Sequence, residues 1–134
     1  MLKQRLIGFA LVAVVGFVEA WAAEMAPDQQ TSSQGGVTIT VAPKGFSSEA
    51  KTWDFAVTLE THTQPLDDDL AKSSALLGNG KSYLPVRWEG DPPGGHHRKG
   101  VLHFKAVTPP PQSVELQIRL AGEASPRIFR WQLK

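Results

Sequence analysis

The chain has 134 residues, of which 41% are hydrophobic and 20% are charged, and its formal net charge is +1. It contains no cysteine, which excludes disulfide bonds, thiol catalysis and cysteine metal ligands. The basic and acidic residues are balanced and interspersed, which argues against nucleic acid as a partner because nucleic-acid binding requires a clustered basic surface.

Residues 1–22 have the three parts of a signal peptide. A positively charged start is followed by an apolar run, Leu6–Val18, and then by small residues at the positions that a signal peptidase recognises, Ala20 and Ala22. The run is shorter than the ~20 apolar residues that a transmembrane helix needs. We therefore expect cleavage after Ala22, export to the periplasm or the cell exterior, and no integral membrane segment in the mature chain.

Residues 23–36 are polar and rich in Gln, Ser and Gly. Such a segment has too little apolar content to pack into a core, so we expect a flexible leader. The folded domain is expected to cover residues 37–134.

From residue 37 onward, apolar and polar residues alternate with the period of half-buried β-strands. The predicted inward rows are Val37/Ile39/Val41, Trp53/Phe55/Val57/Leu59, Leu84/Val86/Trp88, Leu102/Phe104, Val114/Leu116/Ile118/Leu120 and Phe129/Trp131/Leu133. Asn79-Gly80 predicts a hairpin between Ala75–Leu77 and Lys81–Trp88, and the only candidate helix is a short one within Leu66–Ser74. The pattern predicts an all-β fold, an immunoglobulin-like two-sheet antiparallel β-sandwich of six to seven strands.

The stretch from Val37 to Leu133 resembles secreted immunoglobulin-like modules. The resemblance is strongest to small exported proteins that carry Thr-His-Thr/Ser after the second strand and Trp-Glu-Gly-x-Pro-Pro-Gly-Gly-His-His-Arg before the fourth. These pieces are Thr61-His62-Thr63 and Trp88–Arg98 in this chain, beside the hairpin Leu77–Tyr83 and the strand Gly100–Phe104. The resemblance implies a fold and names no activity, since no function is established for that group.

Three histidines are the candidate metal ligands: His62, His96 and His97. Neutral imidazole nitrogens favour copper or zinc, and three or four of them must converge on the ion. Adjacent residues on an extended strand point to opposite faces, so His96 and His97 can share an ion only in an irregular loop. His62 joins them only if its loop lies at the same end of the sandwich.

The alternative interpretation is structural. The histidine pair follows two prolines and two glycines and orders a long loop, in which Arg98 pairs with Glu89 or Asp91. His103 is expected to point outward, because its neighbours Leu102 and Phe104 take the core. These four polar residues (Glu89, Asp91, Arg98 and His103) are the candidates for loop ordering or binding.

Two further polar groups have ordinary explanations beside functional ones. The run Asp67-Asp68-Asp69 is a calcium candidate, but adjacent carboxylates diverge, and a helix cap before Ser74 explains the run as well. Arg119 and Arg130 are expected to pair across strands with Glu115 or Gln132, or else to form a docking face for an acidic partner.

The sequence contains no Gly-x-Ser-x-Gly elbow, phosphate loop or His-Glu-x-x-His motif, so we predict no enzyme. The leading functional hypothesis is a non-catalytic exported binding module that holds copper or zinc through the loop histidines. The alternative is a structural or adhesive β-sandwich that docks another envelope or extracellular protein, with the histidines only ordering a loop.

Overall fold

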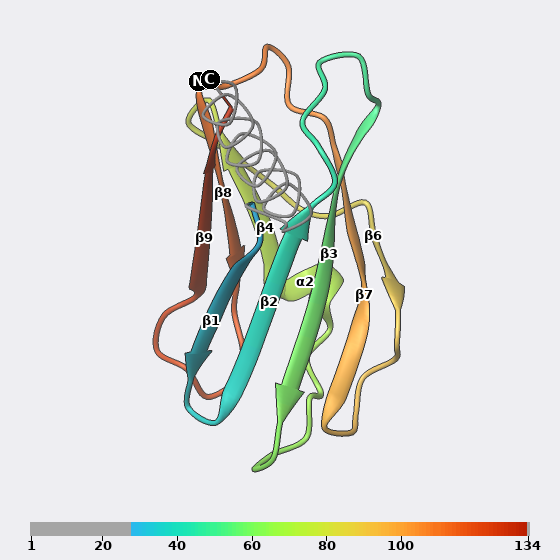
Figure 1. Cartoon of the computed structure of the whole chain (residues 1–134), viewed down its shortest axis with the longest axis vertical. Helices are drawn as coiled ribbons and strands as arrows, with labels where there is room; N and C mark the ends of the chain where they lie inside the picture. Colours follow the sequence, from blue (N-terminus) through green and yellow to red (C-terminus); the bar gives the residue numbers. More distant parts are fainter. Residues whose placement is uncertain (1–27, 134) are drawn as a thin grey trace, which may run out of the picture.

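The computed structural model describes residues 28–133, which form two antiparallel β-sheets packed against each other (Figure 1). The strands are β1 (Gln30–Gln34), β2 (Val37–Pro43), β3 (Thr52–Thr61), β4 (Ser74–Gly78), β5 (Lys81–Tyr83), β6 (Arg87–Gly90), β7 (His97–Lys105), β8 (Ser113–Ile118) and β9 (Arg127–Gln132), and the one helix of the described residues is α2 (Leu70–Ser73). The all-β, two-sheet prediction is confirmed. The described part of the chain has nine strands, however, where six or seven were predicted.

Sheet A has the strand order β1-β2-β3-β7-β6, and sheet B has the order β5-β4-β8-β9. The chain therefore crosses between the sheets after β3, after β5 and after β7. β6 and β5 are edge strands on one flank of the sandwich, while β1 and β9 are edge strands on the other (Figure 1).

The core is built from the inward rows that the alternation predicted on β2, β3, β7, β8 and β9. Trp53, Phe55 and Phe104 are fully buried, and Phe104 lies opposite Trp53 in the β3–β7 pairing. Phe46, from the loop before β3, packs edge-on against Trp53 with ring centroids 5.3 Å apart. Because the inward residues of both sheets are apolar and the outward ones polar, burial of one face of each sheet determines the packing.

The Asn-Gly hairpin and the short helix are confirmed. Asn79 and Gly80 both have positive φ between the paired strands β4 and β5. The helix α2 has one turn, and Asp69 caps it by accepting a hydrogen bond from the Ala71 amide. None of the helices in residues 28–133 has the length and apolar character needed to cross a membrane.

The N-terminal segment differs from the prediction of a flexible leader over 23–36. Residues Gln30–Gln34 form strand β1, which pairs along its whole length with β2. The buried Arg127 holds this polar strand by donating hydrogen bonds to the carbonyls of Ser32, Gln34 and Val37. Main-chain pairing and a buried cation replace the apolar contacts that the segment lacks. The predicted signal peptide and residues 23–27 of the predicted leader lie outside the described residues.

Candidate functional site

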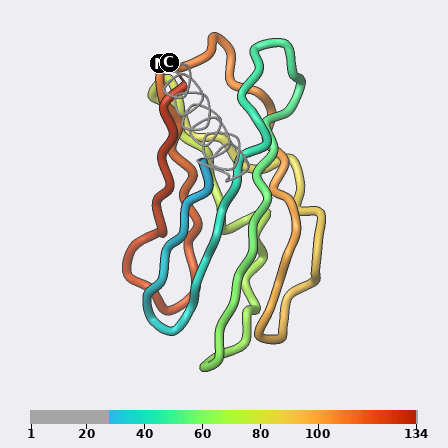
Figure 2. The backbone as a smooth tube through the Cα atoms, viewed as in Figure 1, coloured from blue at the N-terminus to red at the C-terminus, as the bar shows by residue number. Residues whose placement is uncertain are grey.

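The loops that carry His62 and His96 lie at the same end of the sandwich (Figure 2). The Thr61 amide donates to the carbonyl of His96, and the Leu66 amide donates to the carbonyl of Gly95. The Gly94 amide donates back to the Leu66 carbonyl, which completes a small main-chain ladder. The backbone of the glycine–histidine loop is therefore tied to the loop that follows β3.

The three candidate histidines do not form a metal site. Within residues 28–133, no group of three His, Cys, Asp or Glu side chains lies close enough to hold one ion. His97 is the first residue of β7 and faces Glu60 across the strands, with Nε2 3.5 Å from the carboxylate, while His62 and His96 are exposed. The predicted ligand set fails because His97 belongs to a strand and not to the irregular loop that shared coordination required.

Arg98 is the residue that organises this end of the molecule. Its side chain is 1% exposed and points into the sandwich, because Arg98 lies opposite the buried Leu59. Nη1 donates to the carbonyls of Asp68, at 2.6 Å, and Leu66, at 3.3 Å, and Nη2 donates to the carbonyl of Asp91, at 3.2 Å. The predicted ion pair of Arg98 with Glu89 or Asp91 is wrong, because the guanidinium binds main-chain carbonyls from two loops.

The environment of Arg98 explains how a cation is tolerated there. Burial lowers the pKa of Arg98, and the negative charges of four aspartates oppose that effect; they are Asp68, Asp91, Asp69 and Asp67. The guanidinium carbon also lies 5.5 Å from the centre of the Trp88 ring, a cation–π distance. The aspartate run that suggested calcium therefore supplies a negative field around a buried arginine.

The aspartates also have local structural roles. Asp68 accepts a hydrogen bond from the Ala121 amide, and Asp69 caps α2. Asp91 accepts from the Lys99 amide at 2.9 Å and so joins the loop to β7. Among the described residues these carboxylates form no metal cluster, so the calcium interpretation is not supported by geometry.

β6 and β7 approach each other unusually closely at a glycine pair. Gly90 lies directly opposite Gly100, and a Cβ added to Gly100 would lie 2.7 Å from the Trp88 ring. The indole Nε1 of Trp88 donates to the Asp91 carbonyl at 2.9 Å. The glycines let Trp88 lie flat over the strand pair, where its ring covers Arg98.

His103 points outward from β7 as predicted, but it is held between two carboxylates. Nδ1 lies 2.7 Å from Oδ1 of Asp54 on β3, and Nε2 lies 2.8 Å from Oε1 of Glu89 on β6. A carboxylate accepts hydrogen bonds, so an imidazole nitrogen that carries a proton donates to the carboxylate that it faces. The hydrogen bond from His103, followed by that from Arg87, lowers the pKa of Glu89. Three neighbouring strands are thus joined across the outer face of sheet A.

The predicted inward row Leu84/Val86/Trp88 is wrong for Leu84 and Val86, whereas Trp88 is partly buried against the core, opposite Leu102. The predicted strand Lys81–Trp88 divides into β5 and β6, which belong to different sheets, and Leu84-Pro85-Val86 crosses between them. Leu84 is 69% exposed and Val86 59%, the two largest values among the exposed large hydrophobic residues of the described chain. Pro85 is the signal in the sequence, because proline lacks the N–H that a continuous strand needs.

The predicted pairing of Arg130 is confirmed, and that of Arg119 is not. Nε of Arg130 lies 2.9 Å from a carboxylate oxygen of Glu115 on the neighbouring strand. The hydrogen bonds from Gln117 and Arg130 lower the pKa of Glu115. Arg119 follows the end of β8, and none of the ion pairs found in residues 28–133 includes it.

Comparison with protein-family models and with curated proteins finds no match for this chain.

Proposed function

We propose that this chain is an exported, non-catalytic interaction module of immunoglobulin-like type that docks another envelope or extracellular protein. The docking surface is the flank formed by the crossover Leu84–Val86 and the edge strand β6, called the crossover flank below. The observation that carries the proposal is the exposure of Leu84 and Val86 beside an unpaired strand edge.

The strand order supports the immunoglobulin-like type. If β2 to β9 are taken as strands A, B, C, C′, D, E, F and G, sheet A without β1 has the order A-B-E-D. Sheet B then has the order C′-C-F-G. Immunoglobulin domains divide their strands between sheets in this way, and many such domains serve in recognition. The architecture allows many functions, so the proposal depends on the flank.

An edge strand offers main-chain N–H and C=O groups to an incoming strand, a recurring mode of peptide recognition. β6 has four residues and is held to β7 by the Glu89–His103 contact, so it presents a well-ordered edge. Large apolar side chains placed next to such an edge add contact area for the partner. On the opposite flank, the edge of β9 is occupied, because the Gln30 side chain makes hydrogen bonds to the main chain of Arg130.

The loop histidines support the structural role more than the metal-binding role. The main-chain ladder and Arg98 order the glycine–histidine loop, and neither depends on an imidazole. The copper or zinc hypothesis therefore loses the convergence of ligands on which it rested.

Site-specific photocrosslinking in cells that make and export the protein tests the docking proposal. A photoreactive phenylalanine analogue replaces Val86, and a matched control places it at the exposed Gln132 on the opposite edge strand. We expect one discrete crosslinked product from position 86, identifiable by mass spectrometry, which disappears when Leu84→Asp is introduced. Equal crosslinking from position 132 would contradict the proposal, and so would a product that contains only a second copy of this chain.

The mass of the exported protein tests the export step. Cleavage of the predicted signal peptide predicts a mature chain that begins at Ala23. A protein that retains residues 1–22, or that remains inside the cell, would remove the proposed setting of the interaction.

A further inference from the structure

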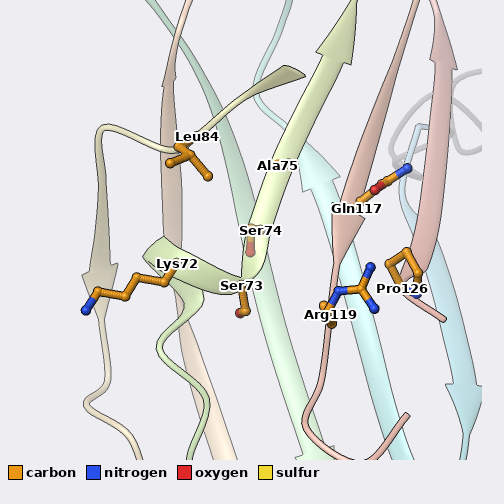
Figure 3. A pocket seen from close by; sticks show the side chains of 8 residues that line it. All are labelled: Lys72, Ser73, Ser74, Ala75, Leu84, Gln117, Arg119 and Pro126. Carbon is orange, nitrogen blue, oxygen red and sulfur yellow. The ribbon is translucent and has the colours of Figure 1, made fainter. Parts of the chain in front are cut away.

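A pocket of about 210 Å³ lies on the outer face of sheet B, beside the base of β4 (Figure 3). Its walls include Ser73, Ser74, Ala75, Leu84, Arg119 and Pro126. In Figure 3, Arg119 and Pro126 lie on one side of the pocket and Ser73 on the other, with Leu84 at its far end. The pocket is smaller than the ~300–1,000 Å³ typical of drug-sized ligands, so it suits a small molecule or the end of a chain.

Arg119, Ser73 and Ser74 supply hydrogen-bond donors to this pocket, and Gln117, whose Nε2 donates to Glu115, is a further polar residue of its wall. Arg119 is exposed and takes part in no ion pair within the described part of the chain. The hydroxyl oxygens of Ser73 and Ser74 are buried and have no hydrogen-bond partner among the described residues. A buried hydroxyl without a partner is unfavourable, so an acceptor placed in the pocket would be stabilised.

No carboxylate lines the pocket, and the nearest ones are already engaged. An adjoining hollow shares Ser73 and Arg119 and is also lined by Asp68, Asp69 and Glu123. Asp68 and Asp69 accept main-chain hydrogen bonds, and Glu123 lies 2.7 Å from the buried Arg127. Each of these acids has a partner elsewhere in the fold, and none of the ion pairs found in residues 28–133 joins one of them to Arg119.

Part of the remaining wall is apolar, beside Lys72 and Gln117. The side chains of Ala75, Leu84 and Pro126 surround the donors, so a fully polar anion such as phosphate would leave apolar surface without contacts. We propose that this pocket binds the carboxylate of a small, partly apolar ligand, with the Arg119 guanidinium and the Ser73 hydroxyl as donors. A free short-chain acid and the terminal carboxylate of a peptide share this chemistry. This site goes beyond the proposed docking of a protein, and it shares Leu84 with the crossover flank.

The test is a titration of the exported protein, labelled with ¹⁵N, followed by NMR. The probes are butyrate, its neutral analogue butyramide, inorganic phosphate and a tripeptide with a free carboxylate or an amidated end. We expect butyrate to shift the amide signals of Ser74 and Ala75 and the side-chain signal of Arg119, while butyramide leaves them unchanged. If the tripeptide with a free carboxylate binds more tightly than butyrate and the amidated tripeptide does not bind, a peptide end is the better ligand. If butyrate binds more tightly, a free acid is the better ligand.

Variants assign the site to its residues. Arg119→Gln should weaken butyrate binding about tenfold or more, since a hydrogen bond to a charged group contributes about 1.5–3 kcal/mol. Lys105→Gln is the matched control for charge, because the exposed Lys105 ends β7 in the other sheet and does not line this pocket, and we expect a change of less than about twofold. Arg119 is exposed, so its variant should fold.

Three outcomes would overturn the assignment. They are the absence of shifts with butyrate, equal shifts with butyramide or phosphate, and unchanged butyrate binding by Arg119→Gln. Photocrosslinking from position 86 is also measured in the Arg119→Gln variant. Butyrate binding then tests the pocket and the crosslinked product tests the docking surface, so that a failure of either proposal is distinguishable from a failure of the other.

Discussion

Replacement of Arg98 by methionine tests whether a buried guanidinium, and not the histidines, holds the loops at this end of the sandwich. Methionine keeps most of the length of the side chain but removes the charge and every donor. Three main-chain carbonyls lose a hydrogen bond in this variant. Those of Leu66 and Asp91 keep a second donor, the Gly94 amide and the Trp88 indole, whereas that of Asp68 is left without a partner.

The expected cost follows from those three bonds. Each hydrogen bond from a charged donor contributes about 1.5–3 kcal/mol, and a buried acceptor without a partner costs about 1–3 kcal/mol. The variant also avoids the desolvation of a buried cation, and Nε of Arg98 has no hydrogen-bond partner in the described structure, so part of the cost is recovered. We expect Arg98→Met to lower the free energy of unfolding by about 3 kcal/mol.

Urea denaturation followed by tryptophan fluorescence measures this change, with the m-value checked for two-state behaviour. Arg87→Met is the matched control, because the Arg87 side chain is 60% exposed and its contact with Glu89 is 3.4 Å long. We expect it to change stability by less than about 0.5 kcal/mol. The double variant His96→Ala/His97→Ala should also stay within about 0.5 kcal/mol, since both side chains are exposed. A loss below about 1 kcal/mol for Arg98→Met, or a larger loss for the histidine variant, would refute the reasoning.

Two further predictions concern other contacts of the fold. Arg127→Met removes hydrogen bonds to three main-chain carbonyls, so it should destabilise the protein by about 3 kcal/mol and make Gln30–Gln34 sensitive to limited proteolysis. The control Arg130→Met removes only an exposed ion pair and should leave the cleavage pattern unchanged. Uniform cleavage in both variants would show that Arg127 does not hold β1. The pKa of Glu89 is lowered in the folded protein from its ordinary 4.5, so its contribution to stability is present above that value and is lost as the pH falls through the folded pKa. The stability difference between the wild type and Glu89→Gln should therefore shrink as the pH is lowered from about 5 toward 3, as measured by urea denaturation, and a difference that grows would contradict this.

The burial of Arg98 could be predicted from the sequence, but only by following the apolar alternation of β7 over its whole length. The inward positions of β7 run back from Phe104 through Leu102 and Gly100 to Arg98, so strict alternation already places Arg98 inward. A charged residue at an inward position is typical of the end of a strand, which is why the local pattern predicts a loop at Arg98. Two of the partners of that arginine, the carbonyls of Leu66 and Asp68, come from a loop 32 and 30 residues away in the sequence, and no local pattern indicates them.

By itself, the sequence determined the strands with a strong apolar alternation, the Asn-Gly hairpin and the aspartate-capped helix, because each depends on neighbouring residues and on the burial of one face. Only the tertiary structure decided three other features. Gln30–Gln34 became a strand through pairing with β2 and the bonds from Arg127, although the segment has no apolar face. Lys81–Trp88 divided between two sheets at Pro85, which left Leu84 and Val86 exposed. The histidines failed to converge because the register of β7 against β3 placed His97 on the outer face. The bonds from Arg127, the placement of β5 and β6 in different sheets and the register of β7 all involve residues distant in the chain, and such contacts leave no periodic signal in the sequence.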